Sequence, residues 1–292
     1  MQQFINTALG GLTTGMVYAA FALALVLIWR STRVVNFAQA PMAMVTTFVA
    51  LAVIDAGFSY WIGFAVALAA GLVLGAIMER GVMRHVQGKG EINAVILTLG
   101  LFIVLHAAAA VVFGNDFRSF PAPFGVRGIE VGGRTVALTG FGIFTIIAVL
   151  VVMGLLVALF RFTDLGLRMR AAAFNPEVAR LLGVRVPRMM TLGWALASLV
   201  GSLAGLLIAG GSLIHPSYMD SVVVLGFVAA VLGGLDSPLG AVVGGLLLGV
   251  TLAFVSGYLG SQLVALAALL ILMIVLMVRP GGIFSTTAAR RV

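Results

Sequence analysis

Long apolar stretches separated by short polar gaps dominate the pattern along the 292-residue chain. A helix needs roughly 20 apolar residues to cross a bilayer, because it rises about 1.5 Å per residue through a hydrocarbon core of about 30 Å. Such stretches occupy residues 4–29, 34–54, 60–78, 92–113, 135–160, 189–214, 239–256 and 262–278. Residues 221–235 are also apolar but number only 15, so they form either a short crossing or a re-entrant half-helix. The pattern predicts an all-α polytopic membrane protein with eight or nine crossings.

The basic residues decide between eight and nine crossings, because cytoplasmic loops are enriched in Lys and Arg. With nine crossings and the N-terminus outside, fourteen of the 17 basic residues fall in cytoplasmic segments and three in the outer loop. With eight crossings, the Arg-bearing C-terminus lies on the side opposite the arginine-rich loop of residues 161–188. We therefore predict about nine transmembrane helices, one of them short or re-entrant, with the N-terminus outside and the C-terminus in the cytoplasm.

Composition excludes a soluble protein. Charged residues make up 9% of the chain and apolar residues 62%, whereas an average soluble domain is about 25% charged. The net charge of +8 does not indicate nucleic-acid binding, because the basic residues lie in short gaps between apolar runs. Cysteine is absent, so neither disulfides nor thiol chemistry are expected. We expect residues 1–292 to form a single transmembrane domain.

The outer loop, residues 114–134, is the only sizeable extracytoplasmic segment expected. Residues 129–136 alternate around a Gly-Gly turn and predict a small β-hairpin. A Gly-Lys-Gly run at residues 88–90 lacks the leading glycine and the Ser or Thr of a phosphate-binding loop. The three histidines are scattered, and neither H-E-x-x-H nor G-x-S-x-G occurs, so we expect no enzyme activity, no bound cofactor and no metal.

The most informative segment lies in the cytoplasmic loop of residues 161–189. Asn175 is a good N-cap, Pro176 suits the first helical position, and Gly183 can end a helix in the left-handed conformation. These signals predict a helix of about 10 Å at the cytoplasmic surface. Its apolar face consists of Val178, Leu181 and Leu182, with Glu177 and Arg180 turned elsewhere. That face either packs on the membrane surface or the bundle floor, or it contacts a partner protein.

Two apolar stretches are interrupted by polar or helix-disrupting residues, which is how membrane proteins build sites near mid-depth. The interruptions are Asn36, Gln39 and Pro41 in the first stretch, and Asp236, Ser237 and Pro238 in the second. Both are either ordinary turns at the cytoplasmic membrane face or parts of a translocation pathway that offer polar groups to a passing zwitterion. We place Asn36, Gln39, Asp236 and Ser237 among the candidate pathway residues.

His106 lies inside the fourth stretch, and an ionisable residue at membrane depth is a functional candidate by default. It joins the candidate pathway residues. The spans show no acidic neighbour for it, so the structural alternative is a neutral histidine bonded to an adjacent helix.

Glycine occurs 37 times and repeats at a spacing of four residues, which suits close helix crossing in lipid. The pairs are Gly11/Gly15, Gly71/Gly75, Gly201/Gly205, Gly240/Gly244 and Gly245/Gly249. We expect all five to serve helix packing.

Several segments together resemble the membrane-spanning subunits of branched-chain amino acid ABC importers. They are residues 11–19 with 35–38, residues 79–84 with Glu79, Arg80 and Arg84, Arg170 with residues 171–184, residues 227–241, and residues 278–284. The resemblance runs essentially from end to end and keeps the family's order. The chain departs from the family pattern at three positions. The family more often has His at the position of Gln39 and Gly or an acidic residue at that of Pro41. At the position of Asp236 it more often has Gly. These departures bear on the substrate more than on the class.

The resemblance implies a permease in the bacterial cytoplasmic (inner) membrane. Its partners are a second, homologous permease, two cytoplasmic ATPase subunits that bind ATP and Mg, and an extracytoplasmic substrate-binding protein. Residues 170–184 are implied to be the coupling loop, so Arg170, Asn175, Pro176, Glu177, Val178, Arg180, Leu181, Leu182 and Gly183 are the candidate contacts to an ATPase. The implied substrate is leucine, isoleucine, valine or another small apolar amino acid, with urea or short amides as the alternative.

Two other functions compete with this one. An ion-coupled carrier or channel usually shows acidic residues inside its spans, whereas Asp55, Asp220 and Asp236 lie at predicted span ends. A carrier also has no use for the capped cytoplasmic helix. A structural or assembly subunit remains compatible with the pattern, but it does not predict a resemblance along the whole chain.

The predicted orientation is testable because the chain has no cysteine of its own. Single cysteines introduced by Ser217→Cys and Gly88→Cys are probed with an impermeant thiol reagent on intact cells. We expect Ser217→Cys to be labelled, and Gly88→Cys to stay unlabelled until the membrane is permeabilised. The opposite labelling pattern would show that the orientation is inverted.

Overall fold

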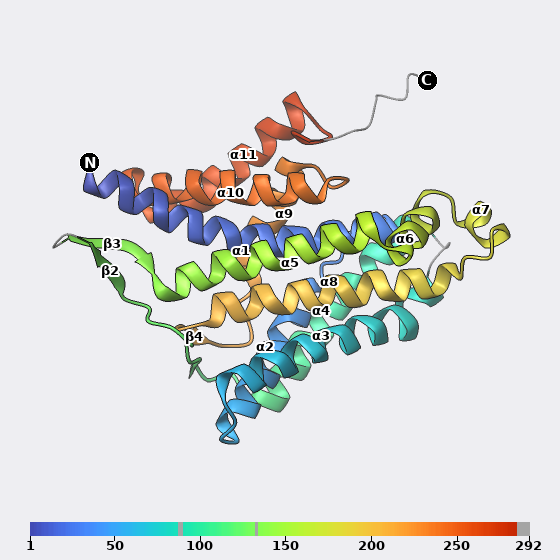
Figure 1. Cartoon of the computed structure of the whole chain (residues 1–292), viewed down its shortest axis with the longest axis horizontal. Coiled ribbons are helices and arrows are strands. Elements are labelled where there is room, and N and C mark those ends of the chain that lie inside the picture. Colours follow the sequence, from blue (N-terminus) through green and yellow to red (C-terminus); the bar gives the residue numbers. More distant parts are fainter. Residues whose placement is uncertain (87–89, 132–133, 285–292) are drawn as a thin grey trace. The chain divides into compact units, whose positions relative to one another are not determined.

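The computed structural model describes residues 1–86, 90–131 and 134–284 (Figure 1). Its α-helices are α1 (Gln2–Thr32), α2 (Gln39–Asp55), α3 (Tyr60–Gly81), α4 (Glu91–Phe113), α5 (Gly140–Phe162), α6 (Asp164–Phe174), α7 (Pro176–Leu181), α8 (Val186–Ala209), α9 (Asp220–Gly233), α10 (Pro238–Phe254) and α11 (Val264–Val278). Its strands are β1 (Arg118–Ser119), β2 (Gly128–Val131), β3 (Arg134–Thr139) and β4 (Leu213–Ile214).

The chain forms two compact units, and each is described by itself. Unit 1 comprises Met1–Val26, Pro121–Val149 and Ser221–Val292, and unit 2 comprises Leu27–Phe120 and Leu150–Asp220. The long helices α1 and α5 each contribute to both units.

In the part of the chain that the structure describes, each of the nine predicted apolar stretches corresponds to an apolar helix. Within the described residues, seven helical segments are long and apolar enough to cross a membrane, and they contain α1, α3, α4, α5, α8, α10 and α11. The other two, α2 and α9, are apolar but have only 17 and 14 residues. At 1.5 Å per residue, α9 is about 21 Å long, less than the hydrocarbon core of about 30 Å. The prediction of an all-α polytopic membrane protein is confirmed.

The second helix begins later than predicted. The apolar stretch starts at residue 34, but α2 begins at Gln39. Arg33 ends α1 with a φ of 58°, in the left-handed region that side chains rarely adopt, and a short turn precedes α2. The apolar pattern therefore predicted the second helix, but it did not predict where the first helix ends and the second begins.

Unit 2 is built around α2, α3 and α8, which pack on one another. Gly71 and Gly75 of α3 lie against α8, where an added Cβ would meet Ser202 and the main chain of Trp194. On α2, the Thr46 hydroxyl donates to Ser202 Oγ over 2.8 Å. Small residues thus let the helices approach closely enough for hydroxyl groups to bond across them.

Unit 1 is held together by the crossing of α1 and α10. Gly11 and Gly15 of α1 lie against Gly249 and Gly245 of α10, with main chain close to main chain. Any side chain at Gly249 would collide with the backbone of Gly15. A conformation this close is open only to glycine, because the missing Cβ is what makes room.

The remaining glycine pairs also pack helices. Gly240 and Gly244 of α10 lie against the C-terminal end of α9, close to the main chain of Gly233. Gly201 and Gly205 of α8 lie against side chains and main chain of α2. The prediction that all five pairs serve packing is confirmed.

The predicted hairpin is present between α4 and α5. Strands β2 and β3 pair antiparallel, with Val131 opposite Arg134, while the Gly132–Gly133 turn lies outside the described residues, as do Gly88 and Lys89. Asn6 at the start of α1 ties the hairpin to the helix: its Oδ1 accepts from the Ala137 N–H over 3.0 Å. A second, two-residue pairing of β1 with β4 in unit 2 was not predicted.

A buried carboxylate joins the end of α3 to the start of α8. Glu79 is fully buried, and Arg84 donates to its two oxygens from Nη2 and Nε, over 2.8 and 3.3 Å. The Thr191 hydroxyl donates to the same carboxylate over 2.6 Å. Arg84 also reaches the Thr191 hydroxyl, over 2.9 Å, and the Pro187 carbonyl, over 3.4 Å. The first turns of α8 are therefore fixed to α3 by a closed polar cluster.

This cluster predicts an order of stabilities. Arg84→Ala leaves a buried carboxylate without its cation, and we expect the lower end of the about 3–5 kcal/mol that such a loss costs, because Arg84 is 39% exposed. Glu79→Gln keeps the shape and removes the charge, so it should cost less. In thermal unfolding of the purified protein, the midpoint of Arg84→Ala should be lowest, and adding Glu79→Gln to it should raise that midpoint. A midpoint for Arg84→Ala at or above that of Glu79→Gln would contradict the assignment.

Candidate coupling and translocation sites

The segment α6–α7–α8 presents the candidate coupling site. Three buried residues, Ala172 of α6, Ala179 of α7 and Val186 of α8, form a small apolar cluster that packs the three helices together. Thr163 caps α6, with its side-chain oxygen accepting from the Gly166 N–H over 3.1 Å. The six-residue α7 is therefore anchored from both flanking helices.

The backbone groups at both ends of α7 are hydrogen-bonded, as the sequence predicted. The Asn175 side-chain oxygen accepts from the N–H groups of Glu177 and Val178, each over 3.1 Å, and Pro176 occupies the first helical position. At the other end Gly183 adopts a φ of 81°, and the Val184 N–H bonds back to the Ala179 carbonyl over 2.9 Å. This six-to-one bond beside a left-handed glycine satisfies the carbonyls that end a helix.

No described segment of the chain covers the apolar face of α7. Leu181 is 88% exposed, Leu182 75% and Val178 48%, while Ala179 on the opposite side is buried. Phe174, at the end of α6, is 94% exposed just before them in the chain and was not among the residues predicted to contact an ATPase. We call these four residues, Phe174, Val178, Leu181 and Leu182, the α7 knob. Exposed apolar side chains grouped like this mark an interaction surface.

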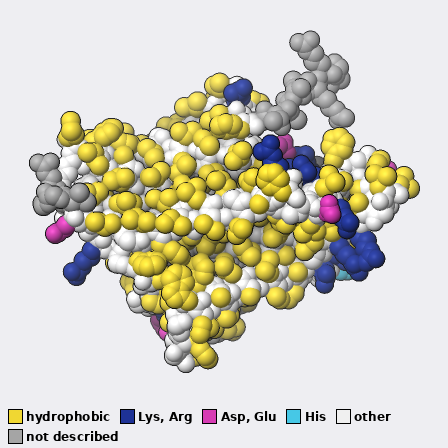
Figure 2. Space-filling view, in the orientation of Figure 1, with side chains coloured by type: hydrophobic (Ala, Val, Ile, Leu, Met, Phe, Trp, Pro, Cys, Tyr) yellow, Lys and Arg dark blue, Asp and Glu magenta, His cyan; other side chains and the backbone are white. Residues whose placement is uncertain are grey.

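Arginines are numerous at the end of unit 2 that carries the α7 knob. The end of unit 2 that carries α6, α7, the start of α8 and the ends of α1, α3 and α5 holds Arg30, Arg33, Arg80, Arg84, Arg161, Arg168, Arg170, Arg180, Arg185 and Arg188. Contacts hold these ends together: Arg84 bonds to the first turns of α8, and the Arg30 guanidinium lies over the Phe160 ring, 6.0 Å from its centroid. Figure 2 shows basic side chains gathered beside α6 and α7. Arg170 and Arg180, both predicted coupling residues, are exposed there.

Asn36 and Gln39, the first pair of candidate pathway residues, are buried and bonded to each other. The Asn36 side-chain nitrogen donates to Gln39 Oε1 over 3.2 Å, and its oxygen accepts from the Ala38 N–H over 3.1 Å. Gln39 in turn donates to the Ala197 carbonyl of α8 over 3.1 Å, in space left by Gly201. In this conformation the two amides join the α1–α2 turn to α8, and their place in a pathway stays a prediction.

Ser237 and Asp236, the second pair, begin α10. The Ser237 hydroxyl accepts from the Gly240 N–H over 3.0 Å, and Pro238 occupies the first helical position. Asp236 is partly buried just before this cap. The cap gives Ser237 a local reason to be polar, and a role of both residues in the pathway stays a prediction.

His106 has an acidic neighbour, contrary to the expectation drawn from the spans. Its Nε2 lies 3.0 Å from the Asp220 carboxylate at the start of α9, and its Nδ1 lies 3.1 Å from the Phe102 carbonyl oxygen. The expectation failed because more than a hundred residues separate the two groups, and only the fold brings them together. The pair ties α4 to the beginning of the short helix α9.

A row of hydroxyl groups between α2 and α8 was also missed. The Tyr218 hydroxyl donates to Thr47 over 2.8 Å and lies 3.2 Å from the Gly205 carbonyl. Burial raises the pKa of Tyr218, and the hydrogen bond to Thr47 opposes that shift only in part. The signal in the sequence was the repetition of Thr and Ser at helical spacing beside the glycines of α8.

No group of three or more His, Asp or Glu side chains suited to holding a metal ion occurs among the residues that the structure describes. The described sites are suited to a mechanical role. The α7 knob is an anchored apolar surface at one end of unit 2, and the closely packed helices of that unit are joined by internal polar bonds.

Comparison with known proteins identifies the family. The chain matches the family described as "Branched-chain amino acid transport system / permease component" over residues 7–278. It is 28% identical to the high-affinity branched-chain amino acid transport system permease protein LivH of Salmonella typhimurium, over 99% of this chain and 98% of the relative. It is 27% identical to the corresponding permease protein BraD of Pseudomonas aeruginosa, over 100% of this chain and 98% of the relative.

A solved structure, PsaBC from Streptococcus pneumoniae in complex with Fab, shares the fold. The similarity has a TM-score of 0.51 at 17% identity and covers 94% of this chain and 91% of that chain. Because the family match extends over nearly the whole chain and the apolar helices agree with it, the protein belongs to the permease components of branched-chain amino acid transport systems.

Proposed function

We propose that this permease forms, with a second homologous permease, the pathway through which branched-chain or other small apolar amino acids cross the bacterial cytoplasmic membrane. The relatives are named as transport proteins for branched-chain amino acids, and the match to them runs along the whole chain. A chain with 9% charged residues also suits a solute without net charge better than an ion. Family membership does not favour the alternative of an ion-coupled carrier or channel.

The energy source and the delivery of substrate belong to partner proteins in this proposal. Two cytoplasmic ATPase subunits bind ATP and Mg and hydrolyse ATP, and an extracytoplasmic binding protein supplies the substrate. The permease itself is non-catalytic. Its role is to convert a movement of the ATPase subunits into a rearrangement of its helices.

The proposed topology has nine crossings, with the N-terminus outside and the C-terminus in the cytoplasm. It is supported by the ten arginines at the α6–α8 end of unit 2, since positive charge is retained on the cytoplasmic side. At the opposite end of unit 2, Arg118 is the one basic residue of the described strands β1 and β4. The short helix α9 then crosses with local thinning of the bilayer or with flanking groups reaching to the interface.

The α7 knob is the observation that carries the proposal of coupling. We infer that Val178, Leu181 and Leu182 insert into a groove on an ATPase subunit. The knob is exposed, it lies among cytoplasmic arginines, and both ends of its helix are capped. Because α7 is anchored to α6 and α8, a force applied to it reaches α8 and, through Glu79, also α3.

Replacement of Leu181 tests the groove. Leu181→Asp places a charge in a contact that should lose its water, a penalty of several kcal/mol. In the reconstituted complex, we expect stimulation of ATP hydrolysis by loaded binding protein and substrate uptake to fall at least tenfold, while the permease still inserts. Leu181→Ala should be intermediate.

The matched control for Leu181→Asp is Arg185→Asp. Arg185 is exposed between α7 and α8 and does not belong to the α7 knob. This control should retain most of the coupling, since it changes charge without entering the proposed contact. Wild-type stimulation and uptake in Leu181→Asp would leave the knob as a passive surface element.

The cap of α7 predicts a graded effect. Asn175→Ala removes the acceptor for two N–H groups and should cost about 1 kcal/mol of helix stability. We expect transport to be reduced a few-fold but not abolished, with Asn175→Asp close to wild type because it restores the acceptor. Loss of all transport in Asn175→Ala would mean that the side chain has a role beyond capping.

The energy source is tested by uptake of leucine in cells or vesicles that carry the binding protein. Uptake should continue when a protonophore collapses the ion gradient, provided that ATP is maintained. It should stop when ATP is exhausted with the gradient intact. The opposite result would favour an ion-coupled carrier.

A further inference from the structure

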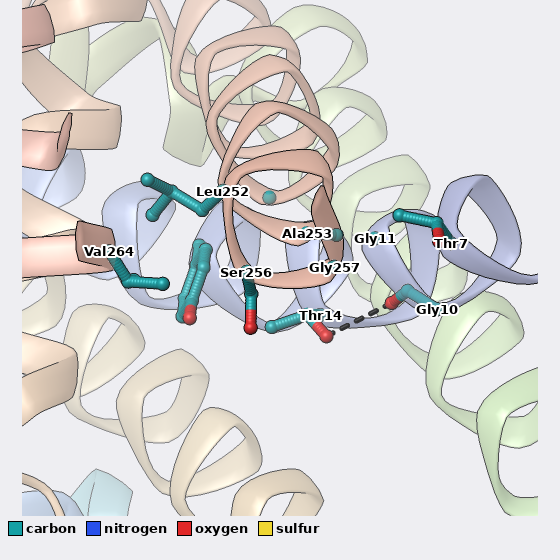
Figure 3. A pocket seen from close by; sticks show the side chains of 11 residues that line it. Thr7, Gly10, Gly11, Thr14, Leu252, Ala253, Ser256, Gly257 and Val264 are labelled. Carbon is teal, nitrogen blue, oxygen red and sulfur yellow. Dashed lines mark hydrogen bonds between the residues drawn. The ribbon is translucent and has the colours of Figure 1, made fainter. Parts of the chain in front are cut away.

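A cavity of about 390 Å³ lies within unit 1, between the first half of α1, the end of α10 and the start of α11 (Figure 3). Its volume falls within the range of about 300–1,000 Å³ that small-molecule sites occupy. It shares no residue with the candidate pathway residues of the sequence analysis. Under the proposed orientation, the start of α1 is outside, so the cavity belongs to the outer half of the membrane.

Hydroxyl groups line the cavity, and three of them lack a partner. Thr7, Tyr18 and Ser256 make no hydrogen bond within the described part of the chain, although all three contribute to the lining. Thr14 donates to the Gly10 carbonyl over 3.0 Å and keeps its lone pairs free to accept. Figure 3 shows the Thr14 and Ser256 hydroxyls pointing to the same side of the cavity. Ser256 is exposed and Thr7 and Tyr18 are half-buried, so water or a polar ligand can reach these hydroxyls and satisfy them.

The remainder of the lining is apolar or backbone. Leu252, Ala253 and Val264 form an apolar side, and none of the lining residues is charged. On the other side, glycines leave the main chain accessible from the cavity. An added Cβ at Gly10 would meet no atom within 4 Å. A cavity with hydroxyl groups on one side and aliphatic groups on the other matches a small molecule that is polar at one end and aliphatic at the other.

The backbone beside the cavity departs from regular α-helix, and helix packing alone does not require this departure. Residues 255–259 form a single π turn at the end of α10, and Ser256 and Gly257 of this turn line the cavity. Gly260 follows with a φ of 118°. Single π turns within α-helices are rare and are found frequently at functional sites.

The cavity is also connected to the outer hairpin. Asn6, one residue before Thr7 of the lining, holds strand β3 through the Ala137 N–H. Gln3, one turn earlier, donates to the carbonyl of Gly257 over 3.4 Å. A protein that docks on the hairpin and shifts the start of α1 would therefore move one wall of the cavity relative to the other.

We propose that this cavity is a contact site for the transported solute on its way through the permease, a small net-neutral zwitterion with an aliphatic side chain. The hydroxyls donate to its carboxylate and accept from its ammonium group, and the side of Leu252 and Val264 takes the aliphatic part. The assignment rests on the proposed function for the identity of the solute. Two other occupants are outcomes of the test. A lipid chain would leave the hydroxyls without hydrogen-bond partners. A helix of the second permease would be expected to place small residues against them.

Thiol labelling tests the occupant directly, because the chain has no cysteine of its own. Ser256→Cys, in the lining, and Ser261→Cys, exposed and outside it, are introduced separately into the full complex in nanodiscs. The rate of labelling of this chain by N-ethylmaleimide is measured with leucine up to its solubility limit, without binding protein, and with glucose as the control solute. We expect leucine to slow labelling of Ser256→Cys at least threefold, and to leave Ser261→Cys unchanged.

Two other results would overturn the inference. If labelling of Ser256→Cys is blocked by assembly with the second permease and does not respond to leucine, the partner's chain occupies the cavity. If labelling is the same in every state, lipid or water fills it. Leucine uptake by the same complex is measured in parallel. If the complex imports leucine but labelling of Ser256→Cys does not respond to it, this inference fails and the proposed function stands. If the complex does not import leucine, the proposed function itself fails.

A second variant tests the cavity by adding bulk at a residue that lines it. Gly10→Phe places a ring in the open space, because no atom lies within 4 Å of the new Cβ. Gly100→Phe on α4 is the control: Gly100 is helical and free of neighbours within 4 Å, as Gly10 is, and it is more exposed than Gly10. With assembly verified for both, we expect leucine uptake to fall at least tenfold in Gly10→Phe and to stay within twofold of wild type in Gly100→Phe. Equal uptake in the two variants would contradict the inference.

Discussion

The hydrocarbon core of a bilayer offers no water to polar groups, and the structure of this permease follows from that constraint. A polar side chain buried between the packed helices is therefore stabilised mainly by a partner inside the protein. Glu79 meets Arg84 and Thr191, and Asn36 and Gln39 bond to each other and to α8. Such bonds are possible only where helices approach closely, which is why glycine occupies the crossings.

The glycines and the polar bonds therefore depend on each other. In unit 2, Gly201 makes the space that Gln39 fills, and Gly71 lets α3 approach the part of α8 where Thr46 bonds to Ser202. In unit 1, the crossing of α1 and α10 has glycine on both sides. A larger residue at one of these positions would separate the helices and, in unit 2, would also break the polar bonds that they support. The destabilisation should then exceed that of a simple steric clash.

The sequence was informative wherever the signal is local. Span positions follow from apolar length, the hairpin from alternation around a glycine pair, and the ends of α7 from Asn175, Pro176 and Gly183. Interactions between distant segments left no comparable signal. His106 and Asp220 are separated by more than a hundred residues, and the hydroxyl bond between Tyr218 and Thr47 joins residues whose types are common everywhere. The cavity beside α10 depends on a π turn, for which no residue pattern in the sequence was diagnostic.

The short length of α7 has a consequence for assembly. Six residues do not form a stable helix in water, because the first hydrogen-bonded turn costs more entropy than one bond returns. Here the caps at Asn175 and Gly183 and the anchors on α6 and α8 order the helix in the permease alone. In the proposed contact with an ATPase subunit, the permease would therefore present a preorganised helix, and ordering of α7 would add no entropy cost to association.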